Sequence, residues 1–243
     1  MTTFKHLVSL SYDFYEDSYE QNLSKLVSGI KKAKEGSIIL SPELCLTNFS
    51  FDDIQSATEF GLEAIEEILK LSVNKLISFS LTTKRDENYY NTAVICYNGK
   101  IVYQRDKYKL FKFGDEHKHF SEGSLEDVKI IEIEGVRFAI LICFEIRFTK
   151  LWEKIKGADV ILVPALWGVL RKKQLEIISN SLAVINQAYV IVSNSKNSDM
   201  ASSSAIISPF GEQIRDDSKD FLQMDFKKSE IKKMRRYMDV GIS

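Results

Sequence analysis

The sequence predicts an α/β fold in which two mixed sheets pack together, with helices outside each sheet. Short apolar runs alternate with segments of helical periodicity in the first and last parts of the 243-residue chain. The middle of the chain has hairpin patterns instead, most clearly at Asn98-Gly99 between two apolar runs. About ten or more strands in one chain are typical of two packed sheets. No linker or internal repeat interrupts the pattern, so we expect residues 1–243 to form a single domain.

The first third of the chain alternates strand and helix. Asp17 or Ser18 can cap the first helix, and Gly36 stands where a helix-ending glycine belongs. The short strand S-I-I-L at 37–40 breaks at a Ser-Pro pair, and Glu43 follows immediately. The expected elements are a strand at 5–11, the capped helix, a strand at 37–40, a helix at 57–75 and a strand at 76–83.

Hairpins and one long loop make up the middle of the chain. A hairpin of strands at 92–97 and 100–105 is followed by a charged and aromatic loop at 106–127. Ordered loops of this length in a compact domain are usually functional. A second hairpin is expected from strands at 129–133 and 136–142.

The alternation of strand and helix returns after Cys143. The basic segment at 225–237 is expected to be helical. Because the formal net charge of the chain is −1, we expect this basic tail to be a solvated helix face or a subunit contact, not a nucleic-acid site. The other expected elements are a helix at 149–156, a strand at 158–163, a helix at 172–187 and strands at 189–193 and 204–207.

Cysteine usage and hydropathy limit the class of protein. Cys45, Cys96 and Cys143 are odd in number and form no C-x-x-C pair, which indicates reduced thiols and a cytoplasmic location. The N-terminal residues lack the apolar region of a signal peptide, and no apolar run approaches the ~20 residues that cross a membrane. We therefore expect neither a membrane nor a nucleic acid as partner.

The stretch V-R-F-A-I-L-I-C-F-E-I-R-F at 136–148 is an apolar strand that ends in a thiol and charged residues. Ligands collect at the carboxyl ends of strands in open α/β sheets, so this stretch indicates a site. Cys143 is either a nucleophile, at a strand end beside the charged residues Glu145 and Arg147 where a thiolate could be stabilised, or a buried small hydrophobic residue. Cys96, inside a strand, is expected to be a buried hydrophobic residue.

A nucleophilic thiol needs a base, and the sequence offers two kinds. Glu43 follows a strand end, where partly apolar surroundings would favour its use as a base, although an exposed loop carboxylate is the alternative. His117 and His119 lie in the long loop, where they could pair with Cys143, bind a metal weakly without a third ligand, or simply be solvated. The spacing of these residues leaves the alternatives open.

Three separated stretches together resemble the nitrilase superfamily of carbon–nitrogen hydrolases. They are L-S-P-E-L-C-L-T-N-F around Glu43, Y-Q-R-D-K-Y-K-L-F-K-F-G-D-E-H-K-H-F-S-E-G around Lys107 and Glu116, and A-I-L-I-C-F-E-I-R-F-T-K-L-W around Cys143. The stretches G-A-D-V-I-L-V-P-A-L-W and S-A-I-I-S-P-F-G-E are similar to the family as well, so the resemblance covers most of the chain. It implies a four-layer α-β-β-α sandwich of two mixed sheets.

The resemblance implies a catalytic triad of Glu43, Lys107 and Cys143, with Glu116 as a second glutamate that orients Lys107 or the attacking group. In the implied reaction Glu43 takes the proton of Cys143, the thiolate attacks an amide carbonyl, and water hydrolyses the resulting thioester. Lys107 and the backbone N–H of Phe144 would face the oxygen that becomes negative. The resemblance implies no metal and no organic cofactor.

The loop around Lys107 resembles most closely the short bacterial omega-amidases, which implies a 2-oxoglutaramate-type substrate and a homodimer or higher homo-oligomer. Phe144, Arg147 and Trp167 would lie near the substrate pocket, although Trp167 could serve packing alone and Arg147 could hold a structural carboxylate. Phe144 and Glu145 stand where the family often has Tyr and Asp, which leaves the substrate open. The alternatives are an N-carbamoyl amidase, an acyltransferase, or a non-catalytic binding protein on the same scaffold.

Overall fold

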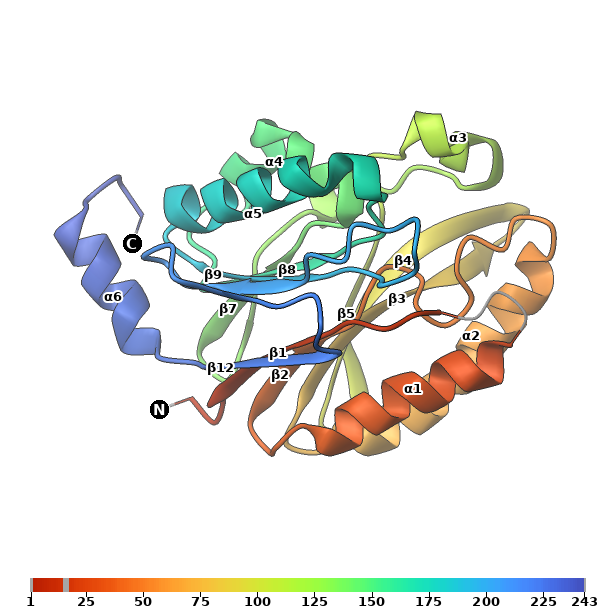
Figure 1. The fold of residues 1–243 in the computed structure, drawn as a ribbon, viewed down its shortest axis with the longest axis horizontal. Helices are drawn as coiled ribbons and strands as arrows, with labels where there is room; N and C mark the ends of the chain where they lie inside the picture. Colours follow the sequence, from red (N-terminus) through yellow and green to blue (C-terminus); the bar gives the residue numbers. More distant parts are fainter. Residues whose placement is uncertain (1, 15–17, 243) are drawn as a thin grey trace.

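The structure is a computed structural model that describes residues 2–14 and 18–242. Two mixed sheets of six strands each lie face to face between two layers of helices (Figure 1). The expected α/β fold, a four-layer sandwich of two mixed sheets, is therefore confirmed. None of the helices in the described ranges combines the length and the apolar content needed to cross a membrane.

The first sheet has the strand order β12-β1-β2-β3-β4-β5. The central strands β1, β2 and β3 run parallel, while β4, β5 and β12 add to them in antiparallel fashion. In chain order the strands of this sheet are β1 His6–Leu10, β2 Ser37–Leu40, β3 Leu76–Arg85, β4 Asn88–Tyr97, β5 Lys100–Asp106 and β12 Phe221–Asp225.

The second sheet has the order β11-β10-β9-β8-β7-β6, and its central strands β7, β8 and β9 run parallel. β7 and β8 therefore end at the same edge, which brings the residues after them together. The strands of this sheet are β6 Ile131–Ile133, β7 Val136–Ile140, β8 Val160–Pro164, β9 Tyr189–Ser193, β10 Ala205–Ile207 and β11 Gln213–Arg215.

Helices cover the outer face of each sheet. Figure 1 shows α1 and α2 outside the first sheet, and α4 and α5 outside the second. Ser18 caps α1 by accepting a hydrogen bond from the backbone N–H of Gln21, while Asp17, the other candidate cap, lies outside the described residues. The helices are α1 Tyr19–Lys32, α2 Ile54–Leu71, α3 Glu116–His119, α4 Thr149–Lys154, α5 Lys172–Asn186 and α6 Lys228–Tyr237, and the 3-10 helices are η1 Lys112–Gly114, η2 Leu125–Asp127, η3 Cys143–Arg147 and η4 Val169–Arg171.

A ladder of serine hydroxyls joins the two sheets across their interface. Hydroxyls on or just after β1 and β9 donate to backbone carbonyls of the opposite sheet, so the contact combines apolar packing with directed hydrogen bonds. The donors and acceptors are Ser9 to Val192 at 2.7 Å, Ser11 to Asn194 at 2.7 Å, Ser195 to Tyr12 at 3.3 Å, and Ser193 to Leu10. We call these bonds the serine ladder.

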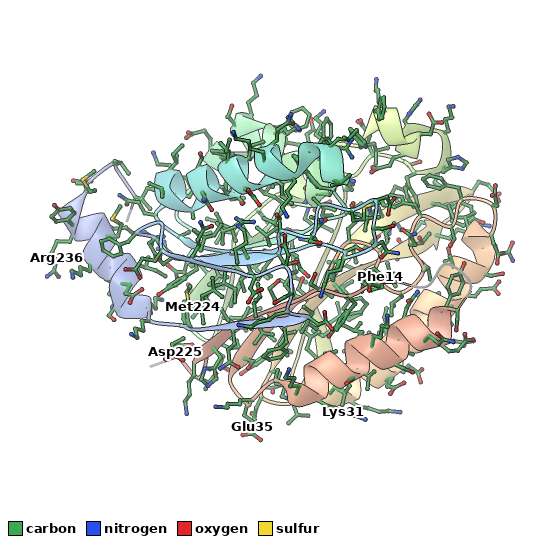
Figure 2. The ribbon with its side chains drawn as sticks, viewed as in Figure 1. Phe14, Lys31, Glu35, Met224, Asp225 and Arg236 are labelled. Atoms are coloured by element: carbon green, nitrogen blue, oxygen red, sulfur yellow. The ribbon has the colours of Figure 1, made fainter. Side chains whose placement is uncertain are left out.

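The basic C-terminal segment is only partly a solvated face. Figure 2 shows Arg236 pointing away from the body of the protein. In contrast, Arg235 and Lys228 of α6 turn inward to the buried carboxylate of Asp159, at 3.2 Å and 3.3 Å. These ion pairs anchor α6 to the second sheet, which the sequence pattern did not predict.

Two other features differ from expectation. β3 and β4 extend to Arg85 and from Asn88, because Asp86 takes a left-handed φ of 52° and closes a tight hairpin turn where a polar loop was expected. β11 and β12 were not expected at all. β12 joins the edge of the first sheet by antiparallel pairing with β1, in which Asp225 lies opposite His6.

Candidate active site

Glu43 is held between the two sheets just after β2. Its backbone N–H donates to the carbonyl of Ala165, which follows β8 of the second sheet, at 3.2 Å. The next residue, Leu44, has a left-handed φ of 45° and donates its N–H to the hydroxyl of Ser80 at 2.7 Å. The side chain of Glu43 is only 1% exposed, so the alternative of an exposed loop carboxylate is wrong.

Lys107 follows β5 and is completely buried. Its Nζ lies 2.7 Å from Oε1 of Glu43 and 2.7 Å from Oε1 of Glu116. Glu116, the first residue of α3, is also buried and accepts the backbone N–H of Phe111 at 3.0 Å. A buried ammonium needs such partners, because leaving it unpaired in a poorly polar interior costs several kcal/mol.

Cys143 begins η3 shortly after the end of β7 and has a left-handed φ of 50°. A non-glycine residue in this region of backbone space is strained, and such strain is concentrated at functional sites. The thiol accepts the backbone N–H of Leu166 at 3.5 Å, and Cys143 is 7% exposed. The backbone therefore presents this sulfur to the edge where β7 and β8 end.

Burial, together with the charges of the site, shifts the pKa values of its members. Burial raises the pKa of the Cys143 thiol well above its usual value, and the negative charges of Glu43 and Glu116 raise it further against the opposing effect of Lys107. Burial lowers the pKa of Lys107, but its acidic neighbours outweigh burial and leave that pKa raised. Burial likewise raises the pKa of Glu116, against the lowering effect of Lys107. Near neutral pH the site therefore holds a protonated thiol and a charged ammonium.

Asn91 is a member of the site that the sequence did not reveal. Its side-chain Nδ2 donates to Oε1 of Glu43 at 2.8 Å, and its backbone carbonyl accepts the N–H of Lys107 at 2.8 Å. A polar amide inside the apolar strand Y-N-T-A-V-I was the available signal, since buried polar side chains are kept only with partners.

Glu145 does not stabilise the thiolate of Cys143, which corrects the sequence-based expectation. Instead it forms a buried pair with Arg105, whose two terminal nitrogens lie 2.5 Å and 2.7 Å from the two carboxylate oxygens. The same carboxylate accepts the backbone N–H groups of Tyr108 at 2.6 Å and Ile142 at 2.7 Å. This arrangement, which we call the Arg105–Glu145 clamp, ties the segment carrying Lys107 to the segment carrying Cys143.

A pocket of about 220 Å³ opens beside Cys143. Arg147 is exposed at this pocket, where its guanidinium lies 4.7 Å from the ring of Trp167 and donates to Oε1 of Gln174. Arg171, which was not anticipated, lies 5.0 Å from the ring of Phe111. The residues that line the pocket are Phe111, Cys143, Phe144, Arg147, Leu166, Trp167 and Arg171.

The two loop histidines lie on the surface. His117 and His119 are both exposed, and the ring of His119 stacks on Phe51 at a centroid distance of 4.0 Å. Within the described ranges, no three His, Cys, Asp or Glu side chains are grouped to hold a metal ion. Glu43, not a histidine, is therefore the candidate base for Cys143.

Comparison with known proteins adds to this geometry. A family model described as carbon-nitrogen hydrolase matches residues 8–236. The 2-oxoglutaramate amidase of Bacillus subtilis (strain 168) is 26% identical over 223 residues, which cover 87% of this chain and 85% of that protein. Omega-amidase YafV of Escherichia coli (strain K12) is 26% identical over 185 residues, covering 73% of this chain and 71% of that protein.

The fold is also found among solved structures. XC1258 from Xanthomonas campestris, a CN-hydrolase superfamily protein with an arsenic adduct in its active site, superposes with a TM-score of 0.83 at 18% sequence identity. The superposition covers 96% of this chain and 94% of that one.

Proposed function

Since the chain belongs to the carbon–nitrogen hydrolase family, we propose that it is a thiol amidase that hydrolyses a small linear amide to a carboxylic acid and ammonia. The observation that carries this proposal is the buried cluster of Glu43, Lys107 and Glu116, whose charges reach the thiol of Cys143. The members of this cluster come from different parts of the chain, and Cys143 also lines the pocket.

The first half of the reaction forms a thioester. Because its pKa is raised, the Cys143 thiol does not ionise by itself near neutral pH, and Glu43 takes its proton as the sulfur attacks the amide carbon. The carbonyl oxygen becomes negative and is stabilised by Lys107 and the backbone N–H of Phe144. One such donor is typically worth about 3–4 kcal/mol of activation free energy. The C–N bond then breaks, and Glu43 returns the proton to the departing nitrogen, which leaves as ammonia.

The second half regenerates the enzyme. Water enters, Glu43 removes its proton, and the oxygen attacks the thioester carbon. The C–S bond breaks, Cys143 takes the proton back, and the carboxylic acid is released. Glu116 keeps Lys107 in place through its 2.7 Å contact, so the ammonium faces the same oxygen in both halves.

The proposed substrate carries a carboxylate at the end remote from the amide. Two guanidinium groups, of Arg147 and Arg171, lie on the pocket, and arginine pairs with carboxylates through parallel hydrogen bonds. The guanidinium of Arg147 lies over the ring of Trp167, and that of Arg171 lies over the ring of Phe111. The similarity to 2-oxoglutaramate amidase supports the same substrate class, an acid of the 2-oxoglutaramate type.

The test is ammonia release from a panel of acidic ω-amides, matched neutral amides, ureido acids and nitriles. We expect the acidic amides to be preferred, Cys143→Ala to abolish ammonia release, and Arg147→Ala to raise KM for acidic substrates more than for neutral ones. Activity that survives in Cys143→Ala, or a preference for neutral amides, would contradict the proposal.

Two alternatives are separated by related measurements. A non-catalytic binding protein would leave Cys143 no more reactive toward iodoacetamide at neutral pH than the buried Cys96. An acyltransferase would pass the thioester to an added amine, which the product mass reveals.

A further inference from the structure

We propose that Asn91 is a positioning residue that orients Glu43, so that one carboxylate oxygen is fixed and the other is left to exchange protons. The inference rests on the proposed role of Glu43 as the base. It extends that role to a residue outside the three sequence stretches that pointed to this site.

The two oxygens of Glu43 have unequal surroundings. Oε1 accepts hydrogen bonds from Nδ2 of Asn91 at 2.8 Å and from Nζ of Lys107 at 2.7 Å. Oε2 is buried and has no hydrogen-bond partner among the described residues. Two donors on one oxygen occupy its lone pairs, so the unpaired Oε2 is the oxygen able to take up a proton.

Asn91 is itself firmly placed. It lies in β4 opposite Thr82 of β3, its side chain is completely buried, and its backbone carbonyl accepts the N–H of Lys107. One residue therefore sets both the start of the segment carrying Lys107 and the rotation of the Glu43 carboxylate. A rotated carboxylate would offer a different oxygen to the thiol.

The hydrogen bonding of Asn91 also argues against a purely structural role. Its side-chain Oδ1 is buried and has no partner within the described ranges. A buried amide that is only half paired costs free energy of folding. Since a carboxylate accepts but does not donate, the NH₂ end of the amide must face Glu43. The contact with Glu43 is what offsets the cost of burying this side chain.

A neutral donor suits a base better than a second cation would. Lys107 already places one full positive charge 2.7 Å from Oε1 of Glu43, and a second cation would draw still more strongly on the electrons of a group that must accept a proton. An amide N–H fixes the orientation with a weaker electrostatic effect. Removing it should therefore leave the Glu43 carboxylate free to rotate, and a carboxylate put in its place would repel the negative charge of Glu43.

The experiment compares Asn91→Asp, Asn91→Ser and the parent enzyme. Asp keeps the shape of Asn but replaces the donor by an acceptor, whereas Ser keeps a hydroxyl donor on a shorter side chain. For Asn91→Asp we expect kcat to fall by about 10- to 100-fold and the acid limb of the kcat/KM profile to move up by about one pH unit. Asn91→Ser should keep part of the activity and show a smaller shift.

The matched control is the same exchange at another buried asparagine, Asn186→Asp. Asn186 lies in α5 and donates to the carbonyl of Leu182 at 3.2 Å, remote from the Glu43 cluster. We expect its pH profile to coincide with that of the parent. An unshifted acid limb in both Asn91 variants, or an equal shift in Asn186→Asp, would overturn the proposal. If Asn91→Asp does not fold, Asn91→Ser decides alone.

A second readout does not depend on a substrate. The rate of alkylation of Cys143 by iodoacetamide, followed by mass spectrometry of its peptide between pH 5 and 9, should show the same ordering of acid limbs. If the parent releases no ammonia from any amide, the proposed function fails, while the alkylation profile still decides the role of Asn91. Identical alkylation profiles in the parent and both variants would reject the positioning role alone.

Discussion

Two buried ion clusters lie side by side in this protein, and they treat their carboxylates differently. In the Arg105–Glu145 clamp both oxygens of Glu145 accept hydrogen bonds, from the guanidinium and from backbone N–H groups. In the other cluster Glu43 is bonded through Oε1 alone, and its buried Oε2 has no partner among the described residues. The contrast teaches that the carboxylate joining two segments is saturated with donors, whereas the carboxylate that we propose as the base keeps one oxygen free.

The largest difference between the clusters should appear in catalysis. Glu43→Gln removes the proposed base while Lys107 keeps its bond to Glu116, so folding should be little affected. We expect kcat to fall by about 10²- to 10⁴-fold. Ammonia release by the purified variant, together with its thermal unfolding curve, checks this expectation. A variant as active as the parent would remove Glu43 from the mechanism.

Glu145→Gln should reduce the stability of the fold, the property that Glu43→Gln should leave nearly unchanged. It leaves the buried Arg105 guanidinium without its counter-charge, and breaking a buried pair in this way costs about 3–5 kcal/mol of unfolding free energy. Denaturant unfolding measures this cost. The double variant Arg105→Met with Glu145→Leu should recover much of the loss, because it removes both charges. A single variant that unfolds at the parent's midpoint would show that the clamp does not stabilise the fold.

The two clusters should differ in how steeply the unfolding free energy declines with pH in alkaline solution. The raised pKa of Cys143 means that the folded state holds a proton which the unfolded chain releases above pH ~8.5, so stability falls as pH rises. Lys107 adds a change of the same sign above pH ~10.4. Each group contributes up to ~1.4 kcal/mol per pH unit.

Unfolding measured between pH 8.5 and 10.5 tests this difference. We expect Cys143→Ala to flatten the decline in stability, because the other buried thiols remain but this one no longer titrates. Glu145→Gln should lower the curve at every pH without changing its slope, since Cys143 and Lys107 remain in this variant. A Cys143→Ala curve parallel to that of the parent would count against the linkage.

The smallest effect is expected from an ion pair at the surface. Lys154 and Glu126 lie 3.4 Å apart, and the side chain of Glu126 is 84% exposed. Water and salt screen such a pair, so Glu126→Gln should change the unfolding free energy by less than about 1 kcal/mol. Thermal unfolding of this variant provides the baseline for the buried pairs. A larger loss would mean that exposure to solvent does not explain why this surface pair contributes less stability than the buried pairs of Lys107 and Arg105.

The sequence predicted the fold well where local patterns decide it. The apolar run before Cys143 and the break after S-I-I-L located two strand ends that the structure brings together, and the hairpin at Asn98-Gly99 formed as expected. β11 and β12 escaped prediction because they are short and partly exposed, and because β12 is defined by pairing with β1 at the other end of the chain. Such distant register is not encoded in a local period.

The candidate site was predictable in part. Glu43, Lys107, Glu116 and Cys143 were found through resemblance, and the structure brings them into one buried cluster. Asn91 was missed because a lone amide in a strand has no motif.

The partner of Glu145 was missed because an ion pair between residues 40 positions apart leaves no local signal. Arg105 does stand two residues before Lys107, so on an extended strand it shares that residue's face. The single domain, the cytoplasmic location and the homodimer stay predictions.

The serine ladder has a consequence for how the residues of the proposed active site stay aligned. Glu43 and Lys107 are carried by one sheet and Cys143 by the other, so their spacing depends on how the sheets are seated against each other. Serine hydroxyls of each sheet donate to backbone carbonyls of the other, so the hydrogen bonds run in both directions across the interface. Apolar packing alone would tolerate a small slide, but these bonds are directional and would break. When the serines of the ladder are replaced by alanine, turnover should therefore be lost before the protein unfolds.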